Sequence, residues 1–187
     1  MEGARQIPQQ LQQQSKLVIE DFRKELATLR TGRANPAMLD RVVVDYYGSQ
    51  TPLPQLATVS VPEPRTLLIQ AWDKNAVKEI ERALLKSDLG LTPAVDGNLI
   101  RLTIPPLTEE RRKELVKIAR KMAEEHRVAV RNLRRDANER IKKAEKAEGL
   151  SENDVHKLQE EVQKGTDRSI EQIDHLLAEK EKEILEV

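Results

Sequence analysis

The stretch His126-Arg-Val-Ala-Val-Arg-Asn-Leu-Arg-Arg-Asp-Ala-Asn-Glu-Arg140 lies in the middle of the segment Leu107–Glu148, which decides the fold. Neither Gly nor Pro interrupts the chain between Pro106 and Gly149. Apolar residues recur along this segment at three- and four-residue spacing, so a helical rotation of about 100° per residue places them on one side. We expect a single helix of about 40 residues, with an apolar seam formed by Leu115, Ile118, Met122, Ala129, Leu133 and Ala137.

Basic residues occupy the other side of this predicted helix. Two interpretations are open from the residues alone. The basic side is either solvated, or it binds a polyanion through phosphate contacts, for which the bidentate guanidinium of Arg is well suited. The residues that we expect roughly opposite the apolar seam are Lys113, Arg120, Arg127, Arg131 and Arg134, with Arg135 and Lys142 beside them.

The apolar seam requires other helices to cover it, and the sequence offers two. Residues 9–30 predict a first helix, with apolar seam positions at Val18, Phe22 and Leu29 and a stop signal at Arg30 and Gly32. After Gly149, Ser151 and Asp154 have the spacing of a capping box, and Leu150 and Val155 that of a hydrophobic staple, so a last helix begins there. The three helices predict an elongated antiparallel three-helix bundle.

Between the first and second helices the pattern changes to short β-branched runs separated by prolines. We expect strands at 42–47, 58–61, 66–71 and 99–104, and a short helix at 75–89. This segment therefore predicts a small α+β domain. Its aromatic residues could stack on bases, but buried or half-buried sheet positions are favoured for Tyr46, Tyr47 and Trp72.

These elements predict two domains. Residues 1–30 and 106–187 form the discontinuous three-helix bundle, and residues 31–105 form the inserted α+β domain. Two short connections then join the domains, and we expect them to act as a hinge. The hinge residues are Arg30, Thr31, Gly32 and Arg33 in the first connection, and Ile104, Pro105 and Pro106 in the second.

Charge is distributed unevenly although the 187-residue chain has a formal net charge of +0. Residues 105–147 carry 14 Lys and Arg against 8 Asp and Glu, whereas residues 148–187 carry 5 against 12. A neutral total therefore does not exclude nucleic-acid binding. No run of about 18 uncharged apolar residues predicts a membrane span, and no apolar signal core follows Met1.

Catalytic motifs are not found in the sequence. The chain has no Cys, and the three histidines, at positions 126, 156 and 175, lack the spacing of metal ligands. There is no phosphate-binding glycine loop and no nucleophile elbow. The acidic residues alternate with bases at helical i,i+4 spacing, which is typical of solvated helix surfaces. We expect no enzyme activity, no metal site and no cofactor.

Five segments together resemble the ribosome recycling factors of bacteria and organelles. They occur in the order of that family and span most of the chain, although residues 1–14 are Gln-rich and not characteristic of it. The matching segments are Leu29-Arg-Thr-Gly-Arg-Ala-Asn-Pro36, Asp45-Tyr-Tyr-Gly48, Ser87-Asp-Leu-Gly-Leu91, Pro105-Pro-Leu-Thr-Glu-Glu-Arg-Arg-Lys-Glu-Leu115 and Arg127-Val-Ala-Val-Arg-Asn-Leu-Arg-Arg-Asp-Ala137.

This resemblance implies an L-shaped molecule with the outline of a tRNA. It also implies that the chain binds the post-termination ribosome across the A and P sites, mainly through rRNA of the large subunit. Elongation factor G then uses GTP to move the hinged short arm, and the subunits separate with release of mRNA and deacylated tRNA. The implied protein is a monomer of the cytoplasm, or of an organelle if a transit peptide has been removed, and binds neither DNA nor a membrane.

The resemblance also assigns residues to the ribosome-binding surface. It places Arg131, Arg134 and Arg135 against rRNA, with Arg112, Lys113 and Lys117 as secondary candidates. Arg30 and Arg33 either contact RNA or fix the joint. The competing hypothesis is a helical scaffold that binds another protein and has no need of the basic side. A hydrolase that uses surface carboxylates has no supporting motif.

Overall fold

The computed structural model describes residues 2–186, which divide into two compact units. Unit 1 comprises residues 2–30 together with Glu109–Glu186, and unit 2 comprises Thr31–Thr108. Each unit has its own hydrophobic core.

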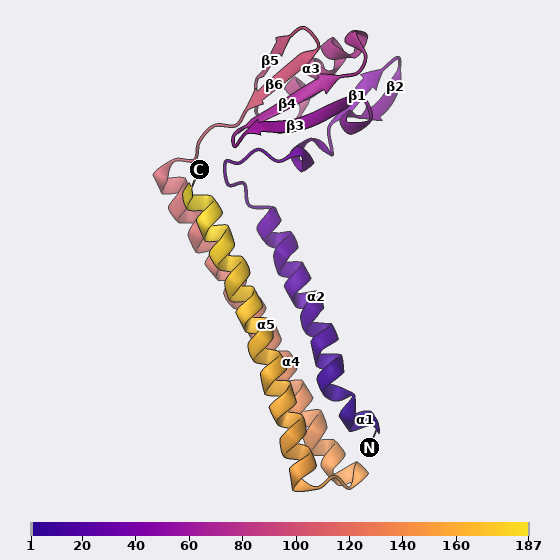
Figure 1. The fold of residues 1–187 in the computed structure, drawn as a ribbon, viewed down its shortest axis with the longest axis vertical. Coiled ribbons are helices and arrows are strands. Elements are labelled where there is room, and N and C mark those ends of the chain that lie inside the picture. The colour runs from indigo at the N-terminus through magenta and orange to yellow at the C-terminus, as the bar shows by residue number, and fades with distance from the viewer. Residues whose placement is uncertain (1, 187) are drawn as a thin grey trace. The chain divides into compact units, whose positions relative to one another are not determined.

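Unit 1 consists of helices. The short α1 (Glu2–Arg5) leads into α2 (Ile7–Ala27), and the two long helices are α4 (Glu109–Glu148) and α5 (Glu152–Glu186). Helices α4 and α5 run antiparallel, and α2 packs against both of them (Figure 1). Among the described residues, none of these helices combines the length and the apolar composition that a membrane span requires.

Helix α2 differs from the predicted first helix at both ends. It begins earlier, because Ile7 and Leu11 are buried together with Ala4 of α1 in a cluster that includes Ile141 of α4. The Gln-rich N-terminal segment is therefore part of the bundle. The helix also ends at Ala27 rather than at residue 30. The Thr28 and Leu29 amides donate to carbonyls only three residues earlier, those of Glu25 and Leu26, at 3.1 Å each, which tightens the last turn. Arg30 consequently lies beyond the helix.

Helix α4 has the predicted length, but its buried side was predicted only in part. Leu115 and Ala137 are buried as expected, and Met122 and Leu133 pack against the cores of the bundle. Ile118 is 37% exposed, and Met122, Ala129 and Leu133 are only half-buried. The bundle has to cover α4 with two helices at close approach, and small side chains permit this better than large ones. The side of α4 that is buried is therefore rotated about the helix axis from the predicted side. Its buried residues are Leu115, Ala119, Ala123, His126, Val130, Ala137 and Ile141.

The turn between α4 and α5 follows the prediction. Gly149 adopts a φ of 67°, which a glycine tolerates at a helix C-terminus. The Ser151 amide donates to Asp154 Oδ2 at 3.3 Å, and the Asp154 amide donates to Ser151 Oγ at 3.1 Å, so the predicted capping box is confirmed. Leu150 and Val155 are both buried in the same cluster, as a staple requires.

Unit 2 contains an antiparallel four-stranded sheet in the order β3-β4-β6-β5, with a separate hairpin of β1 and β2. Helix α3 (Val77–Lys86) buries Val77, Ile80 and Leu84 in the core that the strands also line. Single 3-10 turns precede β1, β3 and α3. The strands are β1 (Val43–Tyr46), β2 (Ser49–Pro52), β3 (Ala57–Glu63), β4 (Thr66–Ala71), β5 (Pro93–Asp96) and β6 (Leu99–Thr103).

Four strands and the helix of unit 2 lie where the sequence predicts them, but β2 and β5 were missed. Both missed strands are short and largely exposed, and both contain a proline, which weakens a strand prediction. In the described part of the chain, β2 pairs with β1 alone and β5 pairs with β6 alone. Each of them is therefore an edge strand, where proline is tolerated. The predicted α+β fold, a helical bundle with a small inserted sheet domain, is nevertheless confirmed.

Candidate nucleic-acid interface

The arginines in the middle of α4 line the edge that faces α5. Arg120 Nε donates to Glu181 Oε1 at 2.6 Å, and Arg127 Nε donates to Asp174 Oδ1 at 2.7 Å. The Arg127 side chain is only 20% exposed. These two arginines therefore join α4 to α5, and the expectation that they lie roughly opposite the apolar seam is wrong for both.

Arg131 belongs to the same edge but is more accessible, at 40% exposed. Its Nη1 lies 3.0 Å from Oε1 of Glu124, and Arg127 Nη1 lies 3.0 Å from the other oxygen of the same carboxylate. The two hydrogen bonds, first that from Arg127 and then that from Arg131, hold the pKa of Glu124 below its ordinary value. A shallow groove between α4 and α5 is lined by Arg127 and Arg131 together with Glu124, Ile170, Asp174, Leu177, Ala178 and Glu181.

The next basic residues along α4 are less constrained. Arg134 is half-buried and makes one long hydrogen bond of 3.4 Å to Gln163 Oε1. Arg135 is exposed, and within residues 2–186 it takes part in no ion pair. Arg131, Arg134 and Arg135 thus follow one another along a solvent-accessible part of the helix where a polyanion can replace weak intramolecular partners.

The secondary candidates lie near the start of α4. Arg112 is half-buried and donates from Nη1 to the Leu185 carbonyl at 3.1 Å, so it fastens the C-terminal end of α5. Lys113 and Lys117 are exposed and, in the part of the chain that the structure describes, form no ion pair. Of the three, the two lysines are the ones whose charge is available to a partner.

The two connections between the units each make a hydrogen bond to the turn between β3 and β4. The Ala34 amide donates to the Pro64 carbonyl at 2.8 Å, and the Ile104 amide donates to the Arg65 carbonyl at 2.7 Å. Ile104 is buried, whereas Pro105 and Pro106 are exposed.

The first connection contains a backbone conformation that favours glycine. Gly32 has a φ of 81°, and both Gly32 and Thr31 are buried. A β-carbon at Gly32 would strain this conformation. The flanking Arg30 and Arg33 are exposed.

The aromatic residues of unit 2 only partly follow the prediction of burial. Tyr46 is half-buried, and its hydroxyl donates to Asp73 Oδ2 at 2.8 Å. That hydrogen bond raises the pKa of Tyr46. Tyr47 and Trp72, however, are 76% and 65% exposed, so the predicted burial is wrong for both. They follow the ends of β1 and β4, where the chain leaves the core.

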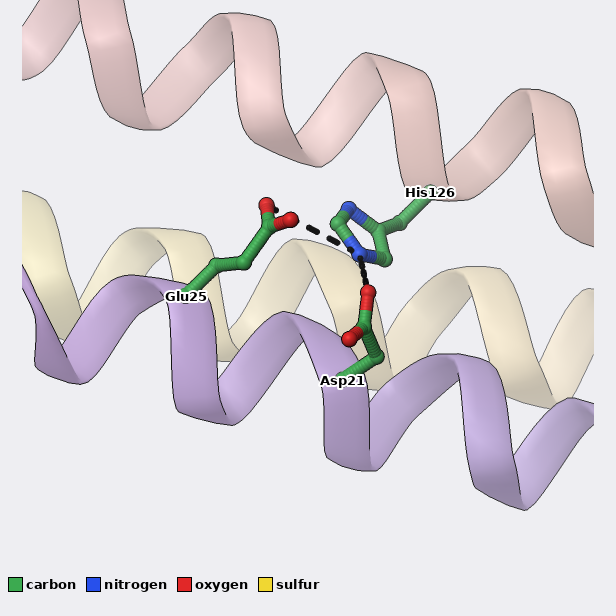
Figure 2. Close-up of side chains that lie close together, drawn as sticks. All are labelled: Asp21, Glu25 and His126. Atoms are coloured by element: carbon green, nitrogen blue, oxygen red, sulfur yellow. Dashed lines mark hydrogen bonds and ion pairs between the residues drawn. The ribbon is translucent and has the colours of Figure 1, made fainter.

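A histidine cluster in the bundle was not predicted. His126 is buried on α4, its Nε2 lies 2.9 Å from Asp21 Oδ2, and Glu25 Oε2 lies 3.9 Å away (Figure 2). Burial opposes the charged ring, but the hydrogen bonds to the Met122 carbonyl and to Asp21 outweigh it and raise the pKa of His126. The partners are more than a hundred residues away in the sequence, so spacing within α4 gives no sign of them.

Comparison with known proteins identifies the family of this chain. The family described as ribosome recycling factor matches residues 22–185. The chain belongs to the ribosome recycling factor family. Ribosome-recycling factor of Brevibacillus brevis is 62% identical over 169 residues, covering 90% of this chain and 91% of the relative. Ribosome-recycling factor of Symbiobacterium thermophilum is 54% identical over 183 residues, covering 98% and 99%.

Solved structures of ribosome recycling factors share the fold. A solution structure of the ribosome recycling factor is 46% identical, covers the whole of both chains and has a TM-score of 0.74. Models for the T. thermophilus ribosome recycling factor and the E. coli elongation factor G bound to the E. coli post-termination complex include a chain that is 48% identical with a TM-score of 0.62, covering 97% of this chain and 98% of that one. Ribosome recycling factors are translation factors and not enzymes, which confirms that expectation through family membership.

Proposed function

We propose that this chain recycles ribosomes after termination. It binds the post-termination ribosome across the A and P sites and, with elongation factor G and GTP, separates the subunits and releases mRNA and deacylated tRNA. One observation carries the proposal: the family match covers most of both units, and the 48% identical relative is described together with elongation factor G on a post-termination complex.

The ribosome-binding surface in this proposal is the basic part of α4. Arg131, Arg134 and Arg135 contact phosphates of large-subunit rRNA, and Lys113 and Lys117 add charge near the start of the helix. Arg112 contributes by fixing the end of α5 and contacts RNA less directly. In support, Arg135 and the two lysines are exposed, and the intramolecular partners of Arg131 and Arg134 are themselves exposed polar groups. Such contacts give salt-dependent binding with little sequence preference.

The hinge of the proposal comprises residues 31–33 and 104–106. Hydrogen bonds from Ala34 to Pro64 and from Ile104 to Arg65 fasten both connections to unit 2. Rotation is therefore concentrated in residues 31–33 of the first connection and, in the second, in the residues that follow the anchored Ile104. Arg30 and Arg33 flank the first connection and either contact RNA or fix the joint. The proposed domain boundaries lie at 30/31 and 105/106, and the second is three residues before the division between the compact units at Thr108 and Glu109.

The factor itself uses no cofactor in this account, because elongation factor G hydrolyses the GTP. It acts as a monomer in the bacterial cytoplasm, the compartment that the bacterial relatives indicate. It binds neither DNA nor a membrane.

Sedimentation of post-termination ribosomes through a sucrose gradient tests the proposal. Addition of the protein, elongation factor G and GTP should convert most 70S particles into free subunits, whereas omission of any one of the three should leave them intact. A protein-binding scaffold without ribosomal function predicts intact 70S particles in every sample, and that result would refute the proposal.

A further inference from the structure

The cluster of Asp21, Glu25 and His126 lies inside unit 1, where α2 crosses α4. Asp21 and Glu25 are four residues apart on α2 and therefore project from the same face of that helix. His126 comes from α4 and is 7% exposed. In Figure 2 both carboxylates approach the same nitrogen of the imidazole ring, Nε2. The imidazole is thus fixed by burial, and two more exposed carboxylates face it.

The imidazole is oriented by a group outside the cluster. His126 Nδ1 lies 2.6 Å from the backbone carbonyl of Met122, and a carbonyl oxygen accepts hydrogen bonds only, so Nδ1 carries the proton. Nε2 is thereby turned toward the carboxylates. Histidines that bind metals have this arrangement, with one ring nitrogen donating to a backbone carbonyl and the other facing the ion.

The distances among the three groups are close to those of a metal site. Nε2 lies 2.9 Å from Asp21 Oδ2 and 3.9 Å from Glu25 Oε2, and one ligand atom from each residue lies within 4.8 Å of the others. Ligands around a tetrahedral Zn²⁺ lie about 3.3 Å apart, given metal–ligand bonds of about 2.0 Å. The Asp21 and Glu25 side chains are 64% and 42% exposed, so small rotations of the carboxylates can close the difference.

We propose that Asp21, Glu25 and His126 form a binding site for a divalent transition-metal ion of the Zn²⁺ class, which joins α2 to α4. One imidazole and two carboxylates supply three ligands, and water completes the coordination on the exposed side. On binding, the ion takes the place of the proton that Nε2 carries when the ring is charged, that proton is released to solvent, and Nδ1 keeps its own proton. Ca²⁺ and Mg²⁺ fit less well, because both prefer ligand sets made of oxygen alone.

The other two histidines of the chain provide an internal comparison. His156 lies 3.1 Å from Glu160, and His175 lies 2.9 Å from Glu179, each pair being on α5. Both histidines are more than 70% exposed, and each pair offers two ligands from a single helix. They resemble His126 in having a carboxylate partner, but they are not buried, and residues 2–186 supply no third ligand to either pair.

Titration of the untagged full-length protein with Zn²⁺ against a chromophoric chelator tests the site. The wild type should bind one Zn²⁺ with an affinity that the control double variant His156→Gln/His175→Gln retains. Asp21→Asn, Glu25→Gln and His126→Gln should each weaken binding at least about tenfold. Co²⁺ should give visible ligand-field absorption bands in the wild type and in the control, and not in these three variants.

The two carboxylate variants keep the test valid if His126→Gln does not fold. Asp21 and Glu25 have exposed side chains, so their amide variants should retain the far-ultraviolet circular dichroism of the wild type. Absence of Zn²⁺ binding by the wild type would overturn the proposal. Equal affinity of the wild type and Asp21→Asn/Glu25→Gln, or loss of binding only in the His156/His175 variant, would also overturn it. None of these outcomes bears on ribosome recycling.

Discussion

Arg131 Nη1 lies 3.0 Å from Oε1 of Glu124, two turns earlier on the same helix. The other oxygen of Glu124 accepts a hydrogen bond from Arg127. A single exposed carboxylate thus occupies two guanidinium groups at the edge of the proposed rRNA-binding surface. A phosphate that approaches Arg131 has to compete with Glu124, so this acidic residue should limit the affinity for RNA.

Removal of the Glu124 charge should therefore strengthen ribosome binding. Glu124→Gln frees Arg131 from its ionic partner, and we expect an affinity for 50S subunits about twofold to fivefold higher at low salt. The matched control is Glu125→Gln, which makes the same charge change at an adjacent exposed residue with no ion pair among residues 2–186. Equilibrium binding measures the affinity of both variants for 50S subunits. An equal gain in affinity for Glu125→Gln and Glu124→Gln would contradict this interpretation.

The orientation of α4 in the bundle can be tested with two identical substitutions. Val130 is completely buried, whereas Val128 on the same helix is 43% exposed. Val130→Ala removes two buried carbon atoms and leaves a cavity, so it should lower the free energy of unfolding by about 2 kcal/mol. Val128→Ala should change it by less than about 0.5 kcal/mol. Urea denaturation measures both, and equal losses would argue against the observed orientation.

The local signals of the sequence predicted the architecture well. The uninterrupted run between Pro106 and Gly149 predicted α4, and the capping box at Ser151 and Asp154 predicted the start of α5, because both depend on neighbours in the chain. The seam of α4 was predicted from its large apolar residues, but helices that approach closely bury small ones, such as Ala119 and Ala123. The strands with prolines were missed for an equally physical reason, since an unpaired strand edge tolerates them.

The candidate site could be predicted only in part from the sequence. Resemblance supplied Arg131, Arg134 and Arg135, but periodicity alone could not tell which arginines pair with α5. The bond between Arg127 and Asp174 depends on the register of two helices across a bundle. His126 illustrates the same limit, since its partner Asp21 is 105 residues away in the sequence.

Because of the capping box of α5, the free energy of unfolding of the bundle should depend on pH in the acidic range. Ser151→Ala removes the hydroxyl that accepts from the Asp154 amide, and we expect a loss of about 1 kcal/mol in the free energy of unfolding. Hydrogen bonds from Ser151, side chain first and then backbone, hold the pKa of Asp154 below its ordinary value. The contribution of Asp154 is therefore fully present above its unfolded pKa and is lost as pH falls through the lower folded value.

Comparison of the wild type with Asp154→Asn across pH measures this contribution. The wild type should be more stable at pH 7 and pH 5, and the difference should shrink below about pH 4. Asp136→Asn, at an exposed position on α4, serves as the control for a general effect of charge. A difference that stayed constant down to pH 3 would show that the Asp154 carboxylate does not act in this way.

Restriction of the hinge should separate binding from splitting. The chain contains no cysteine, so one cysteine introduced in each unit can be joined by a cleavable crosslinker without side reactions at native thiols. The crosslinked protein should bind 50S subunits with unchanged affinity but should not split post-termination ribosomes. Cleavage of the crosslinker should restore splitting in the same sample. Full splitting by the crosslinked protein would rule out a requirement for movement between the units.

The central claim is that basic residues of α4 bind the ribosome, and the salt dependence of 50S binding tests it most directly. Arg131→Glu/Arg134→Glu should bind at least about tenfold more weakly, with a salt slope smaller by about one for each phosphate that no longer pairs with an arginine. Lys164→Glu/Arg168→Glu makes the same charge change at exposed positions of α5 and should bind like the wild type. An unchanged affinity and salt slope in a folded Arg131→Glu/Arg134→Glu variant would contradict the account.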